Sequence, residues 1–204
     1  PWARKTILLT LGPYDDYELV WGADPPGILS IDNLRIEEVD PAIVVLHEGF
    51  DGAIHPGLVL HDQAHIETRN AVVGSGSLAM AQDFGQLPMA MQWGFLEDDC
   101  HYLSTDPKVI PLKPNTSYTV SFAFQQRSGR TRGNYFYVYA GSKTAGPDHQ
   151  LGFTRWLDLD DGQVRYKTFS FTTGDYDDYQ IIWGIHNGGS CLLDEVIIIE
   201  NGSN

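Results

Sequence analysis

Residues 167–200 read KTFSFTTGDYDDYQIIWGIHNGGSCLLDEVIIIE, and this stretch decides the fold class. It holds three runs rich in β-branched and aromatic residues, which are Lys167 to Thr173, Tyr179 to Ile185 and Cys191 to Glu200. Glycine, aspartate and asparagine separate the runs. Branched and aromatic side chains pack well on a pleated surface, whereas glycine and aspartate favour turns. The stretch therefore predicts three β-strands joined by turns.

A diverged copy of this stretch lies at the other end of the chain. The first 42 residues align without gaps with the last 42 at an offset of 162, and fourteen pairs are identical. These pairs are Lys5/Lys167, Thr6/Thr168, Thr10/Thr172, Gly12/Gly174, Tyr14/Tyr176, Asp15/Asp177, Asp16/Asp178, Tyr17/Tyr179, Trp21/Trp183, Gly22/Gly184, Gly27/Gly189, Asp32/Asp194, Ile36/Ile198 and Glu38/Glu200. Unrelated segments of this composition would share only about two or three identities. The repeat therefore predicts strands at Lys5 to Leu11, Tyr17 to Ala23 and Leu29 to Glu38.

The chain between the two copies has the same strand-like pattern. Short apolar runs bounded by turn residues continue from Ile43 onward, and no segment shows the period of a helix. We predict an all-β fold in which residues 41–204 form a complete two-sheet antiparallel β-sandwich of the jelly-roll type. Residues 1–40 are predicted to be the C-terminal three strands of a preceding or partner β-sandwich repeat.

Residues 1–40 need a partner, because three strands cannot bury an apolar face alone. They either pack on the module that follows them or complete a module whose front part lies on another chain. The first 40 residues would then be explained by a fragment cut from a longer tandem array, or by strand donation between subunits.

The composition excludes some classes of partner. Lys and Arg number 13 against 27 Asp and Glu, and the resulting formal charge of −14 argues against binding to nucleic acid. No apolar run approaches the roughly 18 to 20 residues that cross a bilayer, and the first residues lack the apolar stretch of a signal peptide. We expect no membrane span, and we expect that any export signal has been removed. Whether Cys100 and Cys191 pair stays open.

Five short motifs follow one another along the complete module. They are residues 48–52 (EGFDG), 74–80 (GSGSLAM), 112–122 (LKPNTSYTVSF), 167–172 (KTFSFT) and 193–196 (LDEV). In this order they resemble the jelly-roll carbohydrate-binding modules of the galactose-binding-like superfold, which occur in tandem beside polysaccharide-degrading enzymes. The resemblance implies a non-catalytic module that binds a polysaccharide or other glycan and belongs to an extracellular or cell-surface protein.

The resemblance also implies a structural calcium ion that ties the first strand to the last. Its ligands would include the carboxylates of Asp51 and Asp194, with backbone oxygens near Gly76 and Ser77. A hard cation prefers several oxygen ligands and can join segments that are distant in sequence. The alternative is that the two carboxylates accept hydrogen bonds from turn backbone.

A sugar site needs exposed flat aromatic rings beside groups that form hydrogen bonds. Alternation along residues 134–139 places Tyr135, Tyr137 and Tyr139 on one face of their strand. The predicted strand that precedes this one carries Gln125 and Arg127 on its outward face. We therefore predict a platform formed by the three tyrosines, Gln125 and Arg127. The alternative is that the tyrosines pack beneath a loop or against the N-terminal segment.

Three further residues are candidates for ligand contact. Trp93 and Trp156 lie near predicted loops, and His186 follows a strand at a place where the first copy has Asp24. Trp21 and Trp183, which match each other in the repeat, are predicted to be structural.

Sequence motifs give no support for catalysis. The chain has no nucleophile elbow, phosphate loop or zinc-protease motif, so we predict a protein that is not an enzyme. Two functions stay open. One is a polysaccharide-binding module, and the other is a structural subunit of an extracellular assembly in which residues 1–40 complete or clamp a neighbouring subunit.

Overall fold

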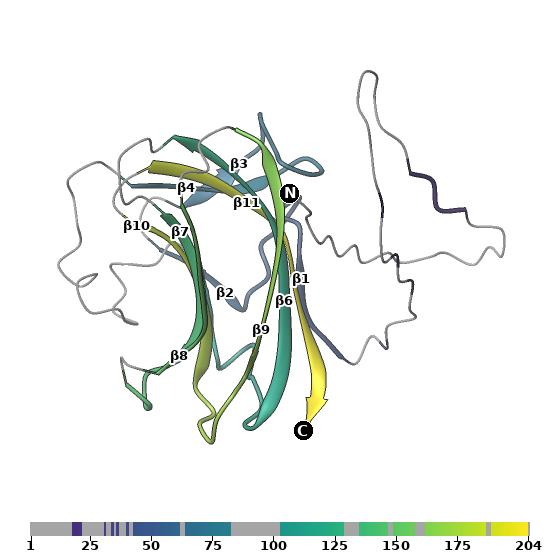
Figure 1. Ribbon diagram of the computed structural model, residues 1–204. Coiled ribbons are helices and arrows are strands. Elements are labelled where there is room, and N and C mark those ends of the chain that lie inside the picture. Colours follow the sequence, from purple (N-terminus) through teal and green to yellow (C-terminus); the bar gives the residue numbers. More distant parts are fainter. Residues whose placement is uncertain are drawn as a thin grey trace.

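The strands of the complete module form two antiparallel sheets. The computed structural model describes residues 18–21, 31, 34, 36, 40, 43–61, 64–82, 103–128, 135–146, 149–157, 162–186 and 189–203. Figure 1 shows the sheets as two layers, with β10, β7 and β8 on one side and β6, β9 and β1 on the other. The described ranges contain no α-helix, so none of their elements is a helix that could cross a membrane. The predicted all-β sandwich is confirmed.

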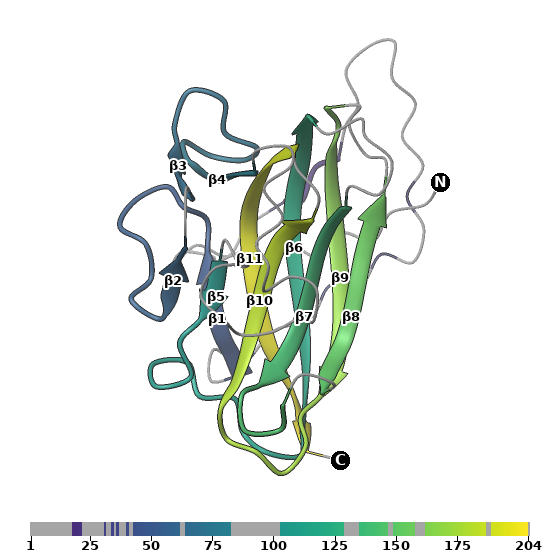
Figure 2. The ribbon, with the colours of Figure 1, turned by 90° about the vertical axis from the view of Figure 1, so that its left-hand side faces the viewer.

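One sheet has six strands and the other has five. The six-stranded sheet runs β3 (His65–Glu67), β4 (Ser77–Gln82), β11 (Gly189–Ser203), β6 (Thr116–Ser128) and β9 (Val164–Thr172), and β1 (Val44–Glu48) also pairs with β11. The five-stranded sheet runs β2 (Leu58–Leu60), β5 (Leu103–Thr105), β10 (Tyr179–His186), β7 (Tyr135–Ser142) and β8 (Gln150–Leu157). Figure 2 looks onto the five-stranded sheet.

The core fills the space between the sheets. Alternation sends Phe122 and Phe124 of β6 inward, and Phe136 and Val138 of β7 inward from the opposite sheet. The rings of Phe124 and Phe136 stack across the interface with their centroids 4.8 Å apart and their planes 12° apart. Trp183 has no exposed surface, which confirms its predicted structural role. Such aromatic packing contributes both buried apolar area and favourable ring geometry.

The three strands of the C-terminal copy belong to different sheets. β9 and β11 lie in the six-stranded sheet, and β10 lies in the five-stranded sheet between β5 and β7. The three predicted strands are confirmed in this copy. In the first copy, the described residues 18–21 lie outside any strand. Most of the first copy lies outside the described residues, and the domain division stays a prediction.

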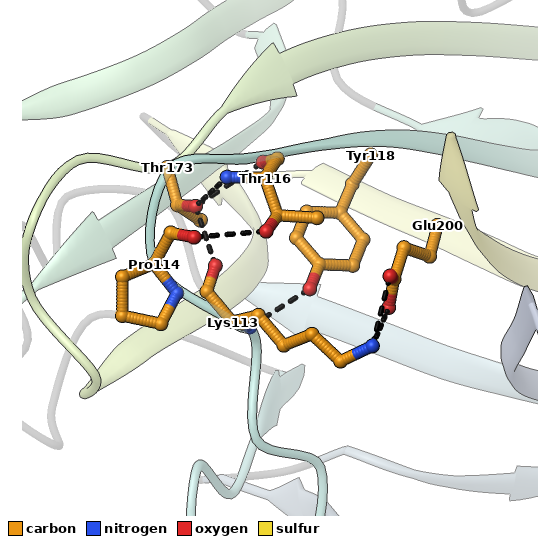
Figure 3. Close-up of polar contacts among 6 residues, drawn as sticks. All are labelled: Lys113, Pro114, Thr116, Tyr118, Thr173 and Glu200. Carbon is orange, nitrogen blue, oxygen red and sulfur yellow. Dashed lines mark hydrogen bonds and ion pairs between the residues drawn. The ribbon is translucent and has the colours of Figure 1, made fainter. Parts of the chain in front are cut away.

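Polar contacts close the end of the sandwich near the C-terminus (Figure 3). The backbone N–H of Lys113 donates to the hydroxyl of Tyr118 over 2.8 Å, as in the tyrosine corner of other sandwiches. The hydroxyl of Thr173 donates to the carbonyl of Lys113 over 2.6 Å and accepts the N–H of Thr116 over 2.9 Å. The side chain of Lys113 pairs with Glu200 at 2.8 Å. These contacts fix the turn before β6 against the end of β9.

The Tyr-Asp-Asp-Tyr motif that revealed the repeat has a structural role. The hydroxyl of Tyr179 accepts the N–H of Gly174 over 2.8 Å and contacts Nε2 of His149 at 2.7 Å. The carboxylate of Asp178 accepts hydrogen bonds from the hydroxyl of Ser142 and from the N–H of Thr144. The motif thus ties the turn before β10 to the turn that follows β7.

Candidate functional site

The outer face of the five-stranded sheet carries a second apolar cluster, separate from the core. It consists of Tyr137 and Tyr139 of β7 and Ile182 of β10, and the ring of Phe153 from β8 lies against both tyrosines. The centroids of Tyr137 and Tyr139 are 6.1 Å apart, and those of Tyr137 and Phe153 are 6.3 Å apart with an interplanar angle of 20°. We call these four residues the aromatic cluster. Its three rings lie over the sheet, and that of Tyr137 stacks on both of the others.

A glycine on the neighbouring strand makes room for the ring of Tyr137. Gly184 of β10 is the cross-strand partner of Tyr137, and a Cβ atom at position 184 would stand 2.9 Å from Cε1 of that ring and nearer still to its hydroxyl end. Ordinary contacts of a Cβ atom begin near 3.4 Å. The phenol ring therefore lies flat across the sheet because the opposite residue has no side chain.

The rings differ in how much surface they expose. Tyr137 is 4% exposed and Tyr139 is 2% exposed, whereas Phe153 is 41% exposed. The prediction that Tyr137 and Tyr139 share a face is confirmed. Their burial matches the alternative in which they are packed rather than presented, so they support Phe153 as the exposed ring of the cluster. The third predicted tyrosine is Tyr135, whose side chain is not among those that the structure describes.

Sequence reasoning missed Phe153. The pairing between β7 and β8 shifts between Val138 and Ala140, which is a bulge that changes the register of β8. Gly152, with a φ of +63°, lies immediately before the exposed ring. A glycine followed by alternating large residues in the run GFTRW was the available signal.

A polar group lies on the same face toward β2. Ser104 of β5 is the cross-strand partner of Ile182, and its hydroxyl contacts Nε2 of His61 at 2.9 Å. Val59 of β2, opposite Ser104, is 37% exposed. The face therefore combines apolar surface with a hydroxyl and an imidazole that can form hydrogen bonds.

The predicted position of Gln125 and Arg127 beside the tyrosines is wrong. Both residues lie on β6, which belongs to the six-stranded sheet, whereas β7 belongs to the other sheet. The two strands are consecutive in sequence, but the chain passes from one sheet to the other between them. Arg127 donates to Oε1 of Gln125 over 3.1 Å and to the carbonyl of Asn70 over 2.8 Å, and Gln125 donates to the carbonyl of Gly162. Both side chains therefore bind backbone near the six-stranded sheet and not the aromatic cluster.

The other predicted ligand residues are placed in part. Trp156 is the cross-strand partner of Phe136, and His186 is the cross-strand partner of Tyr135 at the end of the sheet, while their side chains lie outside the description. Trp93 lies outside the described residues. Their contact with a ligand stays a prediction.

The predicted metal ligands do converge. The carboxylate of Asp51 accepts hydrogen bonds from the N–H groups of Ser75 and Gly76 and from the hydroxyl of Ser75. The buried carboxylate of Asp194 accepts the hydroxyl of Ser77 over 2.7 Å and the N–H of Val73 over 2.9 Å. Two carboxylates from opposite ends of the module therefore hold one turn, residues 73–77, before β4.

The pKa shifts of the two carboxyl groups differ because their surroundings differ. Hydrogen bonds from Ser75 hold the pKa of Asp51 below its ordinary value. Burial raises the pKa of Asp194, and the hydrogen bonds from Ser77 and Val73 oppose this only in part.

The contacts that the structure shows at Asp51 are hydrogen bonds from donor groups. Backbone N–H groups, which cannot bind a metal, point at the same oxygen of Asp51, and the ranges that the structure covers hold no group of three or more His, Cys, Asp or Glu residues suited to a metal ion. These contacts correspond to the alternative in which the carboxylates bind turn backbone. Calcium at this position stays a prediction.

Cys191 is buried with a free thiol, and Cys100 lies outside the described residues. Burial raises the pKa of the Cys191 thiol well above its ordinary value.

Comparisons with known proteins agree with the architecture. No protein-family model matches the sequence, and no curated protein sequence matches it either. The CBM22-1 xylan-binding domain of Xyn10C from Paenibacillus barcinonensis superposes with a TM-score of 0.55 at 14% identity, over 79% of this chain and 96% of that domain. This chain has the fold of the CBM22 carbohydrate-binding modules. The resemblance predicted from the short motifs is confirmed at the level of the fold.

Two other solved structures show how widely this fold is used. The C-terminal family 22 carbohydrate-binding module of Clostridium thermocellum Xyn10B has a TM-score of 0.53 at 14% identity, over 81% of this chain and 99% of that module. The K1 cleaved adhesin domain of Lys-gingipain from Porphyromonas gingivalis has a TM-score of 0.51 at 18% identity, over 77% of this chain and 98% of that domain. Because a fold hosts many functions, these likenesses do not assign a ligand to this chain.

Proposed function

We propose that the chain is a non-catalytic polysaccharide-binding module that holds a glycan chain against the outer face of its five-stranded sheet. The observation that carries the proposal is the half-exposed ring of Phe153, stacked almost parallel on Tyr137. Sugar rings have apolar faces, and an exposed aromatic ring held rigidly from below is a suitable surface for stacking. The fold shared with carbohydrate-binding modules supports the same assignment.

The neighbouring groups suit recognition of a sugar. The ring of His61, which contacts the buried hydroxyl of Ser104, lies on the same face, where it can exchange hydrogen bonds with sugar hydroxyl groups. Val59 adds exposed apolar surface beside them. This set of groups binds and orients a chain, and no bond needs to be broken. Because polysaccharides of this kind lie outside cells, we also propose an extracellular or cell-surface location.

The experiment is affinity electrophoresis in gels that contain one soluble polysaccharide each. Xylan is the first choice because a similar solved structure is described as xylan-binding, and β-glucan, pectin and alginate complete the panel. We expect retardation by at least one polymer and loss of most of that retardation in Phe153→Ala. An affinity loss of about tenfold corresponds to about 1.4 kcal/mol, which lies in the range of one stacked ring.

Tyr176→Ala is the matched control, because Tyr176 is an aromatic residue of similar exposure, 37%, in the turn before β10. It should bind like the wild type. If no polymer retards the protein, or if Phe153→Ala and Tyr176→Ala behave alike, the proposed site is wrong.

A further inference from the structure

Large apolar side chains in the first 40 residues are exposed. The structure describes six of them, with exposed fractions between 43% and 85%. They are Leu19, Val20, Trp21, Ile31, Leu34 and Ile36. An apolar set of this kind on one short segment is unusual for a surface and indicates a binding face.

The repeat shows where such side chains belong. At the offset of 162, the six exposed residues match six residues of the C-terminal copy that are each 0% exposed. The matching residues are Ile181, Ile182, Trp183, Leu193, Val196 and Ile198. Every described apolar residue that is exposed in the first copy thus has a fully buried apolar counterpart in the complete module.

The partner that buries the C-terminal copy is the rest of the sandwich. β9 pairs with β6, β10 pairs with β5 and β7, and β11 pairs with β1, β4 and β6. None of the three strands pairs with another of the three in the described ladders. We call residues 43–157, which contain β1 to β8, the front half. All strand pairings of the C-terminal copy in these ladders are therefore with the front half.

Identical residues of the repeat make specific contacts with the front half. Asp178 binds the turn at Ser142 and Thr144, and Gly184 lies beneath Tyr137. Asp194 binds the turn at Val73 and Ser77, and Glu200 pairs with Lys113. The first copy keeps these residues as Asp16, Gly22, Asp32 and Glu38. It therefore keeps the polar and steric features that fit a front half, as well as the apolar ones.

The chain path also permits this placement. β1 runs antiparallel to β11, with Val44 opposite Ile199, so a strand in the place of β11 ends close to where β1 begins. The residue that matches Ile199 is Glu37, only seven positions before Val44.

We propose that residues 5–38 are an interaction surface whose partner is the front half formed by residues 43–157 of this chain. The segment binds there in the place that β9, β10 and β11 take in the complete module. This inference is independent of glycan binding, because none of its evidence involves the aromatic cluster's exposed ring.

The test uses the full chain with Trp183→Asp, which places a carboxylate in the core and disables the C-terminal copy. If the proposal is right, residues 5–38 replace that copy, and the variant keeps a cooperative thermal unfolding transition and a near-ultraviolet circular dichroism spectrum. Trp21→Asp combined with Trp183→Asp disables both copies and should lose the transition. Trp2→Asp combined with Trp183→Asp is the matched control, because Trp2 corresponds to the exposed Val164, and it should keep the transition.

Two outcomes would overturn the proposal. One is a Trp183→Asp chain that is as unfolded as the double variant, and the other is a Trp21→Asp and Trp183→Asp chain that is as stable as the single variant. A second measurement does not depend on refolding. The wild type should bind an apolar fluorescent dye, and Trp21→Asp alone should lower the dye signal at least twofold; an unchanged signal would contradict the exposed face.

Discussion

Gly184→Ala is expected to destabilise the module through one steric conflict. The new Cβ atom would stand 2.9 Å or less from ring atoms of Tyr137, where ordinary contacts begin near 3.4 Å, so the ring must move by at least 0.5 Å. Tyr137 cannot move freely, because it is 4% exposed and packs on Tyr139 and Phe153. Overpacking of this kind costs about 1–3 kcal/mol. Gly184 lies in a strand and has no left-handed φ, so backbone strain adds nothing.

The assay is urea unfolding followed by circular dichroism. Gly52→Ala is the matched control, because a Cβ atom there has nothing within 4 Å, and it should be neutral or slightly stabilising. In a Tyr137→Ala background the conflict is absent, so adding Gly184→Ala should cost less than about 0.5 kcal/mol. The reasoning is refuted if Gly184→Ala costs no more than Gly52→Ala, or if its cost is unchanged in the Tyr137→Ala background.

Three further predictions concern the polar contacts. Thr173→Val removes a buried hydroxyl that bonds two backbone groups, and it should lower the free energy of unfolding by about 1–3 kcal/mol in urea unfolding. Thr172→Val, at the neighbouring exposed position, is the control and should change the free energy of unfolding by less than about 0.5 kcal/mol. Burial raises the pKa of Asp178, but hydrogen bonds from Ser142 and Thr144 outweigh burial and leave the pKa below the ordinary value of 3.8. The stability that the carboxylate contributes is therefore present above pH 3.8 and is lost as the pH falls through the folded-state pKa. The difference in unfolding free energy between wild type and Asp178→Asn should shrink in acid, and a difference that is constant with pH would contradict this. Calcium is predicted to bind at Asp51 and Asp194, so it should raise the Tm of the wild type but not that of Asp51→Ala; a Tm that neither calcium nor a chelator changes would instead favour the hydrogen bonds from turn backbone.

Local patterns predicted the parts of the fold that depend on neighbours in sequence. The alternation of β7 correctly sends Phe136 and Val138 inward and Tyr137 and Tyr139 outward, because side chains of a strand alternate whatever the strand pairs with. The burial of the outward tyrosines was left open, because it depends on what covers the sheet. The exposed Phe153 was missed, because a bulge in β8 sets its position and a bulge follows from pairing with β7.

Proximity in sequence was a poor guide to proximity in space. Gln125 and Arg127 were placed beside the tyrosines on the assumption that consecutive strands are neighbours, yet β6 and β7 lie in different sheets. In contrast, Asp51, Ser77 and Asp194 were grouped from family motifs, and the structure places them in one cluster around one turn. The contacts within that cluster are hydrogen bonds to turn backbone, which was one of the two alternatives.

The sequence by itself determined the all-β class, the three strands of the C-terminal copy and the internal repeat, because strand propensity, two-residue periodicity and residue identity are properties of the chain that need no partner. Only the tertiary structure decided that β10 separates from β9 and β11 into the other sheet, which residues cover the repeat, and which ring faces solvent. Those outcomes depend on pairings such as Val73 with Asp194, 121 positions apart. Contacts of that length leave no periodic trace along the chain, since they are fixed by how two whole sheets pack.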